Sequence, residues 1–247
     1  MGYSIALAGK GGTGKTTMAG MLIKYLVEKG KTPVLAVDAD ANANLNEVLG
    51  LDVDQTLGGA REEMKRGVST GITKDVFIEM KIQEAVVESP GFDLIVMGRP
   101  EGAGCYCAAN SLLTQFLDKL IDNYSFIVID NEAGMEHISR LTTNNVDILL
   151  VVSDATRRGV QAASRIVELA DSLSLKIQRK MLIINRAGEG QDEGIRKAVE
   201  EFRLDLLGTV PEDPVVKEYD LEGRPTVELG KESRALMAAY DIFDKIL

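Results

Sequence analysis

Short apolar runs that do not alternate with polar residues recur along this 247-residue chain. Runs of this kind are typical of strands that are buried on both faces of a parallel sheet. Between them lie stretches with apolar residues at helical spacing, such as 15–29, which Gly30 would end. This alternation predicts a doubly wound α/β fold, with a mostly parallel sheet and helices on both faces. The predicted strands span 3–8, 33–38, 92–98, 125–130, 147–153, 179–185 and 206–211, and the other predicted helices span 109–122, 157–174, 191–203 and 232–246.

A single domain is expected to cover residues 1–247, because this length, with 45% hydrophobic residues, suffices for one α/β core. Residues 51–91 break the strand–helix alternation. They hold charged pieces and a stretch at 73–88 whose spacing predicts a helix. We expect this segment to be an excursion from the domain, either a lid or a partner-binding surface.

The composition argues against several classes of protein. A net charge of −10 disfavours broad binding to nucleic acid. No apolar run approaches the roughly 20 residues that a membrane span needs, and the start of the chain is typical of a strand rather than of a signal peptide. Two cysteines cannot form a disulfide framework. These features predict a protein of a reducing, cytoplasmic compartment.

The most specific motif is GKGGTGKT at residues 9–16, which follows a predicted strand and opens a predicted helix. In that context the pattern G-x-x-x-x-G-K-[ST] indicates a loop whose backbone N–H groups surround phosphates at a positive helix end. Lys15 would pair with the β- and γ-phosphates, and the Thr16 hydroxyl would reach Mg²⁺. The alternative is a glycine-rich turn without a ligand. The residues expected to contact the nucleotide here are Gly9, Gly11, Gly12, Thr13, Gly14, Lys15, Thr16 and Thr17.

Carboxylates follow two of the predicted strands. Asp38 and Asp40 come after the second strand, and Asp130 ends the strand at 125–130. At the carboxyl ends of parallel strands such groups point into the ligand crevice. One of the first pair would support Mg²⁺ or the loop and the other would orient the attacking water, unless both only cap the next helix. Asp130 has the usual form of the second Mg²⁺-linked carboxylate in such enzymes.

Two residues further along the chain belong to the same region. Gly134 would let the backbone approach the γ-phosphate. His137 is the single histidine of the chain, and a solitary histidine is more often structural than a chemical base.

The KGGxGK[ST] loop resembles that of the deviant Walker A P-loop ATPases, a family that includes septum-positioning ATPases and the nitrogenase iron protein. The resemblance implies that Lys10 reaches across an ATP-bound dimer to the partner's nucleotide. It also implies that Asp40 orients the water while Asp38 lies nearer the metal. The expected catalytic residues are therefore Lys10, Lys15, Asp40 and Asp38, with Thr16, Asp38 and Asp130 at the magnesium, directly or through water.

The same resemblance predicts how the base is read. It places Asn185 at the adenine edge, with Arg186 beside it, and matches VPEDP at 210–214 to a second base-side loop that contains Pro211 and Glu212. The Lys and Asp of an N-K-x-D motif are missing, which favours ATP over GTP. The prolines could equally just shape a turn.

The two cysteines, Cys105 and Cys107, form a Cys-x-Cys pair. Two thiolates can hold one soft metal ion, but zinc and nickel sites commonly need four ligands. A two-fold dimer would place two pairs opposite each other and complete the site. The alternative is a pair of small apolar fillers, because free cysteine is often buried.

Together with DADANANL at 38–45 and DNEAGMEHISR at 130–140, these motifs resemble the CooC-type nickel-insertion ATPases. The resemblance implies an ATP-hydrolysing metallochaperone that dimerises on ATP and Mg²⁺. It would bind one Ni²⁺, or Zn²⁺, and assist carbon monoxide dehydrogenase or acetyl-CoA synthase, without nucleic-acid or membrane partners. Two alternatives stay open: a MinD/ParA-type ATPase switch and an iron–sulfur cluster carrier ATPase.

Overall fold

One sheet organises the molecule. The computed structural model describes residues 2–66, 76, 80–81, 83–98, 121–133, 145–173, 176–188, 190 and 192–247. Within them, eight strands follow the order β3-β4-β2-β5-β1-β6-β7-β8. β3 pairs antiparallel with β4, and every other pairing is parallel. The strands are β1 (Tyr3–Gly9), β2 (Val34–Ala39), β3 (Val86–Ser89), β4 (Phe92–Val96), β5 (Phe126–Asn131), β6 (Asn145–Asp154), β7 (Lys176–Ala187) and β8 (Leu206–Pro211).

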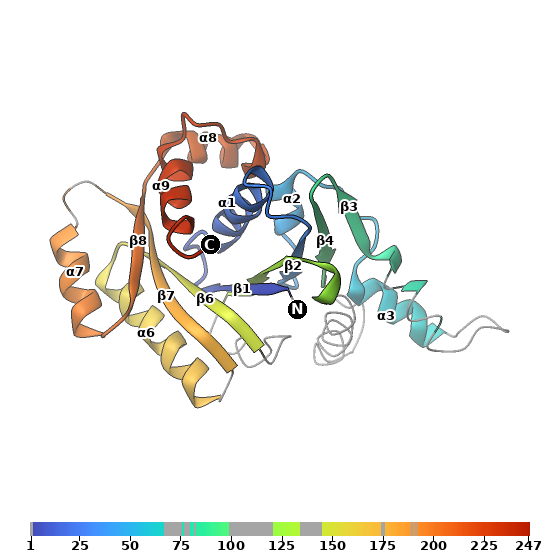
Figure 1. Cartoon of the computed structure of the whole chain (residues 1–247), viewed down its shortest axis with the longest axis horizontal. Helices are drawn as coiled ribbons and strands as arrows, with labels where there is room; N and C mark the ends of the chain where they lie inside the picture. Colours follow the sequence, from blue (N-terminus) through green and yellow to red (C-terminus); the bar gives the residue numbers. More distant parts are fainter. Residues whose placement is uncertain are drawn as a thin grey trace.

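Helices cover both faces of this sheet (Figure 1). One face packs against α1 and α9 through a core that includes Leu22, Leu26 and Phe243. The other face packs against α6 and α7 through a core that includes Val160, Ile166 and Ile195. The helices are α1 (Lys15–Glu28), α2 (Leu45–Leu49), α3 (Leu57–Arg66), α6 (Arg157–Ser172), α7 (Asp192–Glu201), α8 (Pro214–Glu222) and α9 (Arg234–Phe243), with 3₁₀ turns η1 (Ile121–Asn123) and η3 (Thr226–Glu228).

The doubly wound fold predicted from the sequence is confirmed, and all seven predicted strands are present with small shifts at their ends. The helix predicted over 73–88 is wrong at its end, because Val86–Ser89 is the edge strand β3. Valines 86 and 87 pair across to β4, which satisfies their backbone groups better than a last helical turn would. Helices α2, α3 and α8 were not predicted. The helix expected at 109–122 lies almost entirely outside the described residues.

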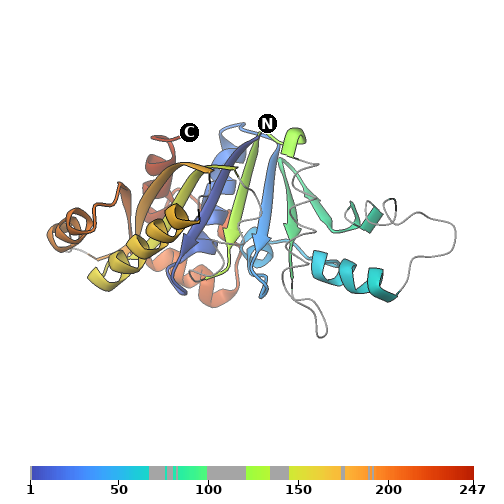
Figure 2. The same cartoon turned by 90° about the horizontal axis from the view of Figure 1, so that it is seen from below.

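The segment 51–91 contributes two different kinds of structure. Leu57, at the start of α3, belongs to the core, and from there α3 extends outward beyond the β3–β4 edge of the sheet (Figure 2). β3 instead adds to the sheet itself. A lid or partner-binding role for this segment stays a prediction. None of the helices in the described part of the chain is both long and apolar enough to cross a membrane.

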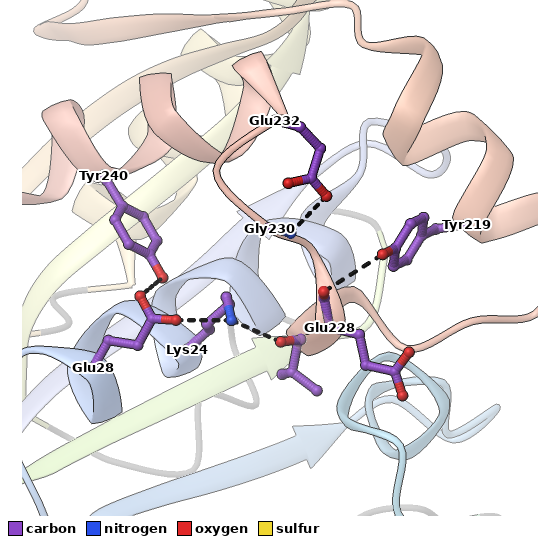
Figure 3. Close-up of polar contacts among 8 residues, drawn as sticks. Lys24, Glu28, Tyr219, Glu228, Gly230, Glu232 and Tyr240 are labelled. Atoms are coloured by element: carbon purple, nitrogen blue, oxygen red, sulfur yellow. Dashed lines mark hydrogen bonds and ion pairs between the residues drawn. The ribbon is translucent and has the colours of Figure 1, made fainter.

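Helix α1 is held against the last helix, α9, and against η3 by a set of polar contacts (Figure 3). Lys24 of α1 donates to the carbonyl of Val227 at 2.8 Å and pairs with Glu28 at 2.8 Å. The Tyr240 hydroxyl of α9 donates to Glu28 at 2.8 Å. These bonds hold the C-terminal half of α1, the helix that begins at the glycine-rich loop.

Candidate functional site

The predicted site residues converge at the carboxyl ends of the central strands. β1 ends at Gly9, where the loop begins. Its neighbour β5 ends near Asp130, and β2, on the far side of β5, ends near Asp38. On the other side of β1, β7 ends near Asn185. Strands β2 to β5 lie on one side of β1 and strands β6 to β8 on the other, so the order of the strands changes direction at β1. Ligands of open α/β sheets bind at such a topological switch point.

Two glycines let the loop fit between its neighbours. A Cβ on Gly9 would lie 2.3 Å from the carbonyl oxygen of Val152 on β6, and one on Gly14 would lie 2.4 Å from Asn185 Nδ2. Gly14 also has φ 86°, a left-handed conformation, at the N-cap of α1. A side chain at Gly9 would clash with the backbone of β6. One at Gly14 would displace the Asn185 amide and would have to adopt a left-handed conformation. The sequence motif is therefore required by the packing as well as by the ligand chemistry.

Lys15 is buried inside this loop, while Lys10 is exposed. The Lys15 ammonium lies 3.4 Å from the carbonyl oxygen of Lys10, which also accepts from the Thr13 hydroxyl at 2.9 Å. Burial lowers the pKa of Lys15, and the nearby charges of Asp130 and Asp40 oppose that shift. A buried ammonium next to carboxylates is placed to meet the charge of a triphosphate.

Asp38 and Asp130 are direct register partners on β2 and β5, so their carboxyl groups lie on the same side of adjacent strands. Both side chains are almost fully buried. Burial raises the pKa of Asp38 to about 6, and the charge of Asp40 adds to the shift, although hydrogen bonds from Leu45 and Asp40 oppose it. Burial likewise raises the pKa of Asp130 to about 7, with Asp38 and Asp40 adding to it and Thr16 and Lys15 opposing it.

Asp38 is engaged with the loop that follows its strand. One carboxylate oxygen accepts from the backbone N–H of Asp40 at 3.0 Å, and the other accepts from the N–H of Leu45 at 2.9 Å. Asp40 in turn accepts from the N–H of Asn42 at 2.8 Å. Asp38 thus fixes both ends of residues 40–45, whereas Asp40 sits half-buried at the edge of the site. The water-orienting role of Asp40 and the metal-side role of Asp38 stay predictions.

Asp130 is the carboxylate that can take a further ligand. Its Oδ1 is buried and has no hydrogen-bond partner within the described part of the chain, while the Thr16 hydroxyl bonds the same carboxylate. An unpaired buried oxygen is costly unless something occupies it. Mg²⁺ usually keeps several waters and is held by one or two protein oxygens together with substrate phosphates. Thr16 and Asp130 fit a magnesium ion of that kind.

A pocket of about 820 Å³ lies beside the loop, between α1, α2 and α8. Asn185 lines it and donates its Nδ2 to the carbonyl of Thr13 at 2.8 Å. Its Oδ1 therefore remains an acceptor, which suits the exocyclic amine of adenine. Arg186, Pro211 and Glu212 line the same pocket, and their role at the base stays a prediction.

The sequence reasoning missed Asp213 and the α2 and α8 walls of this pocket. Asp213 caps α8 by accepting from the N–H of Val215 at 2.9 Å, and its other oxygen accepts from Ser233 at 2.7 Å and from Ala235 at 2.9 Å. Although burial opposes the shift, these bonds lower the pKa of Asp213. The Asp-Pro pair at 213–214 was the available signal, because Asp is a good N-cap and Pro a good first helical residue.

Four of the predicted residues, Cys105, Cys107, Gly134 and His137, lie outside the described residues. Within the described ranges, no group of three or more His, Cys, Asp or Glu side chains is arranged to hold a metal ion. The magnesium position inferred above needs phosphates and waters to complete it, so it is not such a group.

Comparisons with known proteins agree with this geometry. The family model "CbiA: CobQ/CobB/MinD/ParA nucleotide binding domain" matches residues 4–227. The chain belongs to this family. As a CobQ/CobB/MinD/ParA-type protein, it is 42% identical over 248 residues to the uncharacterized ATP-binding protein MJ0685 of Methanocaldococcus jannaschii, which covers 98% of both chains.

Two further relatives within this group are informative. The carbon monoxide dehydrogenase accessory protein CooC of Rhodospirillum rubrum is 33% identical, over 95% of each chain. The structure of the septum site-determining protein MinD of Pyrococcus horikoshii, complexed with Mg-ADP, is 26% identical. It superposes with a TM-score of 0.71 and covers 100% of this chain and 96% of that one. The nucleotide-binding P-loop fold of this chain is thereby established.

Proposed function

We propose that this protein is an ATP-hydrolysing metallochaperone. In this proposal ATP and Mg²⁺ bring two copies face to face, and Cys105 and Cys107 of each copy together hold one Ni²⁺ ion, or a Zn²⁺ ion in its place. Hydrolysis then opens the dimer and releases the metal to carbon monoxide dehydrogenase or acetyl-CoA synthase. The observation that carries the proposal is the 33% identity to CooC over nearly the full length of both chains.

The described residues support the nucleotide-binding part of this proposal. Phosphates would lie against the N–H groups of the loop, with Lys15 balancing their charge. Bound Mg²⁺ would supply charge neutralisation between the phosphates, with Thr16 and Asp130 as its nearest protein groups. Asp40 would orient the attacking water, and Asn185 would accept from the adenine amine.

Lys10 supports the ATP-dependent dimerisation in this proposal. Its side chain is exposed beside the phosphate loop, whereas its carbonyl accepts from Lys15 and Thr13. Its backbone therefore belongs to its own site while its ammonium group is free to reach outward. A lysine in this position can stabilise the charge on a nucleotide bound to a second copy, as an arginine finger does.

The proposed metal site depends on Cys105 and Cys107. Each chain supplies two soft ligands, and a tetrahedral or square-planar site needs four. Two-fold symmetry provides the second pair without another residue type. Because the closed dimer requires ATP, metal affinity would depend on the nucleotide state, which is how turnover could be coupled to metal delivery.

The test is metal binding by the full chain, with and without a non-hydrolysable ATP analogue, together with a mass measurement. We expect about one Ni²⁺ per dimer in the presence of the analogue, from the four-ligand count. The double variant Cys105→Ser/Cys107→Ser should lose tight metal binding but keep nucleotide binding. Unchanged metal affinity in that variant would contradict the proposal and favour a MinD/ParA-type switch. A visible iron–sulfur absorption after anaerobic reconstitution would favour a cluster carrier.

A second test addresses the dimer. Lys10→Ala should still bind nucleotide, but ATP-dependent dimerisation and turnover should fall, because the charge supplied across the interface is lost. Lys231→Ala, which removes another lysine of the chain outside the loop, is the matched control. If Lys10→Ala dimerised as well as the control, the role of Lys10 across the interface would be wrong.

A further inference from the structure

Two consecutive residues at the end of β7 hold the outer side of the phosphate loop. Asn185 donates to the carbonyl oxygen of Thr13 at 2.8 Å, and Arg186 donates through Nη1 to the carbonyl oxygen of Gly12 at 3.1 Å. Asn185 is buried and Arg186 is exposed. Two neighbouring side chains thus bind two neighbouring carbonyls of the loop.

A regular strand cannot do this, because successive side chains point to opposite faces of a sheet. The pairing of β7 with β8 is irregular between Ile184 and Ala187, and Arg186 has φ 56°, a left-handed conformation that is unfavourable for any residue except glycine. Irregularities of this kind redirect a side chain next to a functional site. Here the irregularity turns Arg186 to the same side as Asn185.

The two bonds set the direction of the loop's peptide groups. In a trans peptide the carbonyl and the following N–H point in opposite directions. With the Gly12 and Thr13 carbonyls held outward, the N–H groups of Thr13 and Gly14 face the inside of the loop. Among the described residues, the Thr13 N–H has there one long contact, of 3.4 Å, to the carbonyl of Lys10, so it is available to a stronger acceptor.

We propose that Arg186 is a positioning residue that, with Asn185, preorganises the phosphate loop and so sets the affinity for ATP. Arg186 acts through the Gly12 carbonyl. Ordering the loop before the nucleotide arrives removes part of the conformational cost of binding. This inference rests on nucleotide binding at the site and is independent of the metal-delivery role.

The experiment measures ATP affinity and backbone hydrogen exchange of residues 9–14 in the nucleotide-free protein. The variants are Arg186→Ala, Arg186→Lys and Arg186→Gly, the last of which removes the side chain and also relieves the left-handed backbone. Arg203→Ala is the matched control, because Arg203 is an exposed arginine with φ 53° that lies away from the loop. The same measurements on the unsubstituted protein establish that it binds ATP.

We expect Arg186→Ala and Arg186→Gly to bind ATP about five-fold more weakly, the net effect of one ordinary hydrogen bond. Exchange of residues 9–14 should be faster in both, Arg186→Lys should recover most of the affinity, and Arg203→Ala should match the unsubstituted protein. Equal affinities in Arg186→Ala and Arg203→Ala would overturn the inference. So would weaker binding with unchanged loop exchange, because the arginine would then act on the nucleotide directly. A failure of the unsubstituted protein to bind ATP would instead refute the nucleotide site itself.

Discussion

Among the described residues, burial and charge conflict most clearly at Asp130. It is 2% exposed, next to a second buried carboxylate, and one of its oxygens has no hydrogen-bond partner within the described residues. Protein interiors tolerate such a group only where a ligand or a proton compensates it. Because burial raises the pKa of Asp130 to about 7, a proton compensates it below that pH in the nucleotide-free protein. In the complex the compensation would be the cation carried by the nucleotide.

This arrangement predicts a pH-dependent effect of Asp130→Asn on the stability of the nucleotide-free protein. Between the ordinary aspartate pKa of about 4 and its raised pKa of about 7, the folded state keeps a proton that the unfolded state has released. The contribution of Asp130 to stability is therefore present at low pH and is lost as pH rises through 7. Thermal unfolding should show a larger gain from Asp130→Asn at pH 8 than at pH 5.

The exposed Asp54 offers a control for that experiment, since Asp54→Asn makes the same chemical change away from the site. An equal effect of Asp130→Asn at both pH values would contradict the prediction, because the buried carboxyl group would then not lose its proton between pH 5 and pH 8.

At the scale of elements, α1 and α2 approach each other closely because of one glycine. A Cβ on Gly20 would lie 2.3 Å from Val48 Cγ1 of α2 and 3.6 Å from Thr226 of η3. The valine side chain is branched at Cβ and has little freedom to turn away. Since α2 starts at Leu45, which Asp38 holds, this contact also supports the loop 40–45.

We predict that Gly20→Ala destabilises the protein by about 1–3 kcal/mol through overpacking. The control is Gly194→Ala in α7, where the added methyl group would meet no atom within 4 Å. There the change should stabilise the protein by about 0.5–1 kcal/mol, because alanine favours the helix. Denaturant unfolding measures both values. Stabilisation by both substitutions would mean that α2 moves aside without cost.

The contacts between α9 and α1 allow a second prediction at this scale. Tyr240→Phe removes the bond that the hydroxyl donates to Glu28 (Figure 3). Losing a hydrogen bond to a charged acceptor should lower the free energy of unfolding by about 1–2 kcal/mol. Tyr3→Phe is the matched control, because the Tyr3 ring packs against Phe126 and no hydrogen bond of its hydroxyl is found among the described residues. Equal effects of the two substitutions would argue against the bond.

At the scale of the whole molecule, the site draws on strands from across the sheet. The contributing residues come from β1, β2, β5 and β7 and from the walls α2 and α8. A ligand bound there stabilises all of these elements together, because it binds only the folded arrangement.

Saturation with Mg-ATP should therefore raise the free energy of global unfolding, by about 2.7 kcal/mol at a free ligand concentration of 100 times Kd. In Lys15→Ala the increase should vanish relative to that variant's own nucleotide-free state. Lys176→Ala, an exposed lysine at the start of β7, should keep it. An increase that survives in Lys15→Ala would place the nucleotide elsewhere.

Much of this molecule could be predicted from sequence, for reasons that differ from part to part. The strands were predictable because uninterrupted apolar runs such as 147–153 have no other stable use in a chain of this length. The loop was predictable because its glycines serve packing and phosphate binding at once. The helix end at 85–88 was not, because an edge strand depends on a partner that the local sequence does not reveal.

The pocket walls were also beyond sequence reasoning. The bond from Asn185 to Thr13 joins residues 172 positions apart, and Asp213 accepts from the N–H of Ala235, 22 positions further along the chain. Such pairs depend on the order of the strands in the sheet, and local sequence patterns do not determine that order. Arg186 was assigned to the base side, yet its bond to Gly12 arises from a backbone irregularity that no spacing rule encodes.

The strand order also determines when this protein can acquire its site during synthesis. β1 is made first but lies in the middle of the sheet, and its neighbour β5 is anchored to it by a bond between residues 124 positions apart. The phosphate loop cannot take its final shape until β7 has left the ribosome. Long-range pairings of this kind slow folding and leave apolar strands exposed meanwhile. We therefore expect nucleotide capture to follow the pairing of most of the sheet.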